Sequence, residues 1–198
     1  GSKPLLLYII DRIKKKTKFK LPIIVATSKN KTDDEIEKFC RKNNIKIFRG
    51  SLNDVFNRSV GCFKKFKLNS FVRVCADRPF FDVKLMDKMI KKFFDLKFDI
   101  VTNQFPRTYP KGLSCEIAKT NIFIENLDIK MKKSHKEHIF NYFYENSRKY
   151  KIFNFKLKNN FQKIFKKDFS VNNNKDLIKI NKIYKKHINL NYIDILKL

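Results

Sequence analysis

The chain has 198 residues, of which 42% are hydrophobic, and a formal net charge of +27. This length and composition predict one globular domain over residues 1–198 and exclude a disordered chain. A membrane-spanning helix is excluded because no apolar run approaches the roughly 20 residues that it needs. Four scattered cysteines without a metal-site spacing, and no visible secretory leader, predict free thiols and a cytoplasmic location.

Helix-like and strand-like segments alternate along the chain. Helices are indicated by apolar periodicity and by capping boxes at Thr32 with Glu35 and at Ser134 with Glu137. Strands are indicated by short apolar runs. In chain order we predict helix 5–13, strand 21–26, helix 32–44, strand 45–48, helix 51–63, strand 71–76, helix 82–94, strand 99–102, helix 134–146, strand 152–155 and helix 175–187.

This alternation predicts an α/β fold with a mostly parallel sheet. Residues 103–114 are the least regular stretch and predict an excursion that covers a pocket or contacts a partner. Ligands of such sheets bind beyond the carboxyl ends of the strands, and Asp77 directly follows a predicted strand. Asp77 could therefore hold Mg²⁺ against a substrate phosphate, although a turn-capping role fits the spacing equally well.

Several motifs, in order, resemble the cytidylyltransferase family of CMP-ketodeoxyoctonate synthetases and acylneuraminate cytidylyltransferases. The match is best to the branch related to spore coat polysaccharide biosynthesis protein F. The motifs cover nearly the whole chain and lie at residues 26–28, 50–58, 73–82, 108–112 with Glu116, 136–138 and 192–198. The resemblance implies a three-layer, Rossmann-like nucleotide-diphospho-sugar transferase fold and a homodimer with residues 103–114 as its arm.

The resemblance also implies a reaction, in which the hydroxyl of an acidic sugar attacks CTP to give a CMP-sugar for surface polysaccharide, with Mg²⁺ neutralising charge. Asp77 matches the first metal-binding aspartate, and Arg73 and Arg78 are expected near phosphate or the sugar carboxylate, although Arg78 could equally be a surface residue. Further matches to substrate-binding positions are Thr27, Asn103, Gly112, Glu116 and His138. For His138, packing of a helix-face histidine in the core is an equally good interpretation.

Two departures from the family pattern affect the nucleotide and metal half of the site. The family begins with a strand and a loop of the type A-R-x-x-S-x-R-L-P-x-K, and this chain resembles the family only from the following segment onward. We therefore expect this nucleotide-binding segment, with its strand, to be missing. The family's V-D-T-x-E-D-L motif corresponds to residues 171–177, which puts Asn172 at the second metal-binding aspartate. An amide oxygen brings no charge, so Mg²⁺ affinity is expected to fall.

Lysine accounts for most of the positive charge, since 8 of the 46 basic residues are Arg. Nucleic-acid readers favour Arg, and the lysines here accompany abundant Asn, Ile, Phe and Tyr, whose codons are all rich in A and T. Genome composition explains the whole set, so we expect no nucleic-acid partner. The leading hypothesis is an impaired cytidylyltransferase; the alternatives are a non-catalytic relative that acts in binding or assembly, and a Lys-rich RNA-binding protein.

Overall fold

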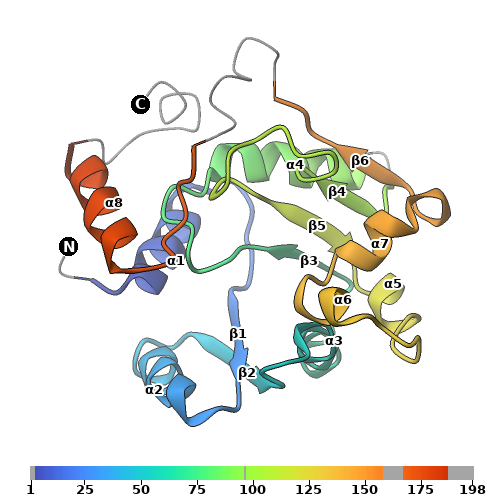
Figure 1. Cartoon of the computed structure of the whole chain (residues 1–198), viewed down its shortest axis with the longest axis horizontal. Coiled ribbons are helices and arrows are strands. Elements are labelled where there is room, and N and C mark those ends of the chain that lie inside the picture. The colour runs from blue at the N-terminus through green and yellow to red at the C-terminus, as the bar shows by residue number, and fades with distance from the viewer. Residues whose placement is uncertain (1–2, 96, 158–166, 187–198) are drawn as a thin grey trace. The chain divides into compact units, whose positions relative to one another are not determined.

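The computed structural model describes residues 3–95, 97–157 and 167–186 (Figure 1). The chain divides into two compact units. Unit 1 consists of Gly1–Lys20, Val72–Ile117 and Ile152–Leu198. Unit 2 consists of Leu21–Phe71 and Ala118–Lys151. Each unit is therefore assembled from segments that lie far apart in the sequence.

Unit 1 contains three long helices and two paired strands. These elements are α1 (Leu5–Lys16), α4 (Val83–Asp95), β4 (Ile100–Thr102), β6 (Ile152–Asn154) and α8 (Asn174–Lys186). Helix α4 packs against both α1 and β4, and β4 pairs in parallel with β6, with Ile100 opposite Ile152. Asp82 starts α4, because its Oδ1 accepts a hydrogen bond of 2.7 Å from the Leu85 N–H.

Unit 2 contains a parallel strand pair and several short helices. Its elements are β1 (Ile24–Ser28), η1 (Lys31–Asp33), α2 (Asp34–Lys42), β2 (Lys46–Gly50), α3 (Val55–Phe66), α5 (Asn121–Ile124), α6 (Lys133–Glu137), α7 (Asn141–Glu145) and η2 (Ser147–Lys149). Strand β1 runs parallel to β2, with Ile24 opposite Lys46, and α3 packs against β1, β2, α5 and α6.

The remaining described strands are β3 (Ser70–Arg73) and β5 (Glu116–Lys119). They complete a four-stranded sheet in the order β3-β5-β4-β6, while β1 and β2 form a sheet of two strands (Figure 1). The predicted α/β class with parallel strands is therefore confirmed, and its described strands belong to two sheets rather than one.

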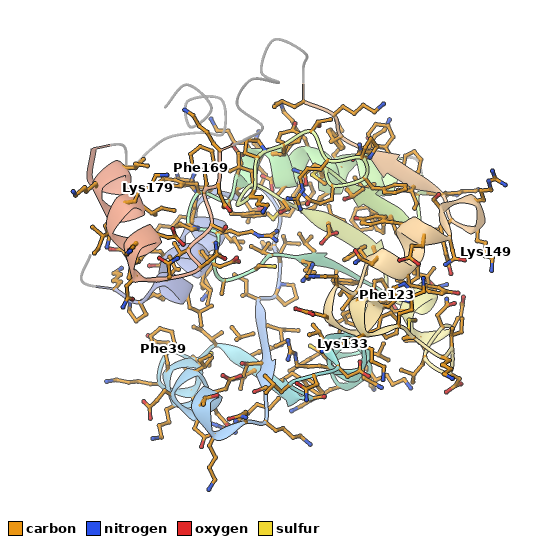
Figure 2. All side chains as sticks on the ribbon, viewed as in Figure 1. Phe39, Phe123, Lys133, Lys149, Phe169 and Lys179 are labelled. Carbon is orange, nitrogen blue, oxygen red and sulfur yellow. The ribbon has the colours of Figure 1, made fainter. Side chains whose placement is uncertain are left out.

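The core of unit 2 is aromatic. The Phe123 side chain is fully buried, and its ring packs against those of five other phenylalanines, namely Phe56, Phe63, Phe71, Phe140 and Phe143, at centroid distances of 4.5–5.7 Å. Figure 2 labels Phe123 among these side chains. Edge-to-face and tilted ring pairs of this kind add to the free energy gained from apolar burial.

The structure corrects two predictions and adds a strand that was not predicted. The Thr32 capping box is wrong, because Asn30 caps the turn before α2 by accepting a 3.0 Å hydrogen bond from the Thr32 N–H. The predicted helix 134–146 is two helices, α6 and α7, because His138 has non-helical backbone angles (φ −108°, ψ 85°). Strand β5 was not predicted, since four residues carry too little periodicity to identify a strand.

Among the described residues, no helix is both long enough and apolar enough to cross a membrane.

Candidate functional site

Asp77 lies four residues after the end of β3 in unit 1. Its Oδ1 is buried and has no hydrogen-bond partner among the described residues, and the Nε of Arg78 is 3.7 Å away. An unsatisfied buried carboxylate oxygen is costly, and a bound cation would remove that cost. The turn-capping interpretation does not account for this oxygen.

Asp77 is the carboxylate that the loop after β3 offers to a metal ion among the described residues near it. The described residues contain no cluster of three or more His, Cys, Asp or Glu side chains that could hold a metal. Mg²⁺ commonly takes one or two carboxylates, and water and phosphate oxygens complete its octahedron. Asp77 can supply one such carboxylate.

Arg73 and Glu116, both predicted site residues, form an ion pair. Arg73 ends β3 and Glu116 begins the neighbouring strand β5, and the Arg73 Nη1 lies 2.9 Å from the Glu116 Oε2. The Glu116 side chain is 7% exposed and that of Arg73 is 25% exposed. The pair is thus largely shielded from solvent, and each charge contributes to compensating the other.

Arg78 and Asn103 both bond to the backbone of residues 113–115. Arg78 Nη1 donates to the Ser114 carbonyl at 3.2 Å, and its side chain is 17% exposed, so the surface interpretation of Arg78 is wrong. Asn103 is fully buried; its Nδ2 donates to the Leu113 carbonyl, and its Oδ1 accepts from the Cys115 N–H, both at 2.9 Å. These contacts fix the loop that leads into β5.

Gly112 and Asn172 belong to two segments that contact each other. The Phe169 N–H donates to the Lys111 carbonyl at 3.0 Å, directly beside Gly112. The Val171 N–H donates to the Asp77 carbonyl at 2.8 Å, which places the backbone just before Asn172 against Asp77. The segment before Asn172 therefore lies against both the Gly112 segment and the loop that carries Asp77.

Thr27 and His138 lie in unit 2. Thr27 is the last residue but one of β1, and its hydroxyl donates to Asp33 Oδ2 at 2.6 Å. His138 directly follows α6, and its side chain is exposed, so the core-packed interpretation of this residue is wrong. The buried histidine of this segment is His135, whose Nε2 is 3.1 Å from Glu145 Oε2.

The carboxylate bonded to Thr27 predicts acid sensitivity. Hydrogen bonds from the Ser28 and Thr27 hydroxyls lower the pKa of Asp33 from 3.8 to about 2. A lowered pKa stabilises the fold above pH 3.8, and this stability is lost as the pH falls towards about 2. In urea unfolding across this range, the wild type should lose stability more steeply than Asp33→Asn. Asp128→Asn, at an exposed carboxylate, is the control and should follow the wild type.

The motif at residues 50–58 has a structural explanation within unit 2. A Cβ on Gly50 would lie 2.6 Å from the Arg58 Cγ, so glycine allows this side chain to lie across the end of β2. Asp54 caps α3 by accepting a 2.9 Å hydrogen bond from the Asn57 N–H. Asp54 also lies 3.5 Å from the Nζ of Lys136, which joins this motif to the motif at 136–138.

Sequence reasoning missed Asp168 and Ser170, which lie in the segment before Asn172. The signal was the alternation of polar and apolar residues from Asp168 to Asn172, typical of an extended segment with one buried face. Phe169 on that face is 4% exposed. The motif at 192–198 lies outside the described residues.

The model of the family described as Cytidylyltransferase matches residues 1–195 of the chain. The chain belongs to the cytidylyltransferase family. A solved cytidylyltransferase from Leptospira borgpetersenii serovar Hardjo-bovis is 26% identical to this family member, with a TM-score of 0.89, over 100% of this chain and 83% of the other.

Two further comparisons agree with this family. Spore coat polysaccharide biosynthesis protein SpsF of Bacillus subtilis is 29% identical over 70% of this cytidylyltransferase-family chain. CMP:2-keto-3-deoxy-manno-octonic acid synthetase, solved in complex with CTP, shares the fold with a TM-score of 0.65 at 11% identity, over 93% of this chain and 88% of the other. The predicted nucleotidyltransferase fold is therefore confirmed. The chain spans 61% and 58% of the lengths of the two curated relatives it matches.

Proposed function

We propose that this chain binds CTP with Mg²⁺ at Asp77 and serves the transfer of CMP to an acidic sugar. The observation that carries the proposal is the buried Oδ1 of Asp77, which accepts no hydrogen bond among the described residues and lies in the loop after β3 of a cytidylyltransferase-family chain. The solved relative with CTP supports the choice of nucleotide. The net charge of +27 would also draw an anionic nucleotide and an anionic sugar towards the chain.

In the proposed reaction, the sugar hydroxyl attacks the α-phosphorus of CTP and the bond to pyrophosphate breaks. The hydroxyl proton passes to water as the new phosphodiester forms, and pyrophosphate leaves with the electron pair of the broken P–O bond. Mg²⁺, when bound, neutralises charge on the phosphate oxygens. Asp77 would hold that ion. Arg78, adjacent to Asp77, is close enough in the chain to meet a phosphate oxygen.

Asn172 favours a second function, which is CTP binding without transfer. Its amide contributes an oxygen ligand without the negative charge of the family's aspartate, so Mg²⁺ affinity is expected to be lower. A chain that retains the family fold but binds its metal weakly could act in binding or assembly. Product formation distinguishes this function from the first.

Thermal unfolding with nucleotides tests the proposal. We expect CTP with Mg²⁺ to raise the Tm more than ATP, GTP or UTP with Mg²⁺, and Asp77→Asn to abolish that increase. The matched control is Asp95→Asn, which removes the same charge from an exposed site at the end of α4 and should keep the CTP-dependent increase. Equal shifts for all four nucleotides would contradict the proposed function.

Asn172→Asp tests the metal half of the same site. Two neighbouring carboxylates repel each other, so this variant should unfold at a slightly lower temperature than the wild type without ligand. With Mg²⁺ and CTP the order should reverse, because the cation compensates both charges. An unchanged Mg²⁺-dependent shift would place residue 172 away from the metal. Product analysis by chromatography, with an acidic sugar present, then separates transfer from binding alone.

A further inference from the structure

Residues Asp168–Asn172, called the strap below, are attached to the loop after β3 at two points. The ring of Phe169 packs edge-on against that of Phe80, with centroids 6.1 Å apart. Two residues later, the Val171 N–H donates to the Asp77 carbonyl at 2.8 Å. Figure 2 labels Phe169 on this segment. The strap thus lies along the same loop that carries the proposed cation ligand.

A third attachment point lies at Gly112. The Phe169 N–H donates to the Lys111 carbonyl at 3.0 Å, so the two backbones run close together. A Cβ on Gly112 would lie 2.5 Å from the Phe169 carbonyl carbon and 2.8 Å from the Ser170 nitrogen. Both are backbone atoms and cannot rotate away as the end of a side chain can. Any residue other than glycine must therefore push the strap outward.

The strap also orients the side chain of Asn172. Asp168 Oδ1 accepts hydrogen bonds from both the N–H and the hydroxyl of Ser170. The Ser170 Oγ in turn accepts from Asn172 Nδ2 at 3.2 Å, and Asp176 accepts from the Asn172 N–H at 3.0 Å. The amide nitrogen of Asn172 is therefore held by Ser170, which leaves the amide oxygen of Asn172 directed away from Ser170.

We propose that Gly112 is a positioning residue for the cation site. By leaving room for the backbone of Phe169 and Ser170, it keeps the strap docked, and the docked strap holds Asn172 next to Asp77. This role differs from the sugar-pocket position that the family resemblance implies for Gly112. The cation part of this inference rests on the proposed function; the docking part does not.

Hydrogen exchange at the Val171 amide tests docking directly, because this N–H bonds to Asp77. In the full chain we expect Gly112→Ala to raise its exchange rate at least about tenfold. The increase could arise from the Cβ contact or from the positive φ of this position, which is +87°. Gly112→Asn separates these two causes, because Asn tolerates a positive φ better than Ala. If the Cβ contact matters, both variants lose protection. If Gly112→Asn keeps it, or neither variant loses it, the inference is wrong.

Lys111→Arg is the matched control, because it changes the exposed side chain of this neighbour, keeps the positive charge that acts on Asp168, and leaves the carbonyl to accept from Phe169. Val171 should keep its protection in this variant. If Gly112→Ala does not fold, Phe169→Leu weakens the same docking from the other side and should also raise exchange at Val171. Unchanged exchange in Phe169→Leu would then overturn the inference.

The effect of Gly112 on the cation site is measured as the affinity for Mn²⁺ in the presence of CTP. Electron paramagnetic resonance detects this binding at a temperature well below the Tm. We expect Gly112→Ala to weaken Mn²⁺ binding several-fold, whereas a purely structural role would lower the Tm and leave this affinity unchanged. If Gly112→Ala binds Mn²⁺ as tightly as the wild type while its Val171 amide exchanges faster, the positioning role is overturned. If the wild type binds no Mn²⁺ with CTP, the proposed function fails, while exchange at Val171 still decides whether Gly112 docks the strap.

Discussion

Replacement of Arg73 by methionine should lower the free energy of unfolding by about 3 kcal/mol, near the lower end of the range for breaking a buried ion pair. The lower end applies because the Arg73 side chain is 25% exposed, whereas that of Glu116 is 7% exposed. The cost arises mainly from the Glu116 carboxylate, which stays shielded from water after its partner is removed. Urea denaturation gives the value directly.

The double variant Arg73→Met with Glu116→Gln is the matched control for this effect. Removing both charges should recover much of the stability that the single change loses, because no buried charge is left uncompensated. Glu116→Gln could instead lower the free energy of unfolding by the same amount in Arg73→Met as in the wild type. That result would show that the two side chains act independently. The ion pair would then have no energetic role.

Phe123→Ala should destabilise the chain by about 3–5 kcal/mol, as expected for a phenylalanine removed from a packed core. Phe123 is fully buried, and its ring lies 4.5 Å from that of Phe143, so its loss leaves a cavity bounded by other rings. A loss of this size is a large part of the stability of an ordinary domain, about 5–15 kcal/mol. Chemical denaturation followed by circular dichroism measures it.

Phe94→Ala removes the same atoms from a side chain that is 65% exposed. Its effect should stay within about 0.5 kcal/mol, as for most surface substitutions. Equal losses for Phe94→Ala and Phe123→Ala would contradict the packing argument, because burial is the main difference between the two positions.

Local signals in the sequence predicted the long helices well. The apolar face of α1 and the cap at Asp82 of α4 are properties of a few neighbouring residues, and the structure confirms both helices. These features depend on contacts within a turn or two of the chain. The predicted strand 71–76 was placed too far along the chain: β3 ends at Arg73, so Asp77 lies four residues beyond the strand rather than directly after it.

Features that depend on distant partners could not be predicted. The ion pair of Arg73 with Glu116 joins residues 43 positions apart, and it requires β5, a strand of four residues. The break at His138 has no proline or glycine beside it to mark the end of a helix. The alternation from Asp168 to Asn172 indicated an extended segment, but its attachment to Asp77 becomes visible only in the fold.

The described glycines of this chain stand where an added side chain would meet other atoms. Glycine codons are rich in G and C, so the base composition that enriches lysine and asparagine also works against glycine, and only 4 remain among 198 residues. At each of the three that the structure describes, Gly50, Gly61 and Gly112, an added Cβ would come within 2.5–2.7 Å of another atom. The strap itself is attached largely through backbone groups, which every amino acid except proline retains. Substitutions in the strap that keep the backbone N–H groups therefore leave these backbone bonds possible, whereas any side chain at Gly112 meets the backbone of Phe169 and Ser170.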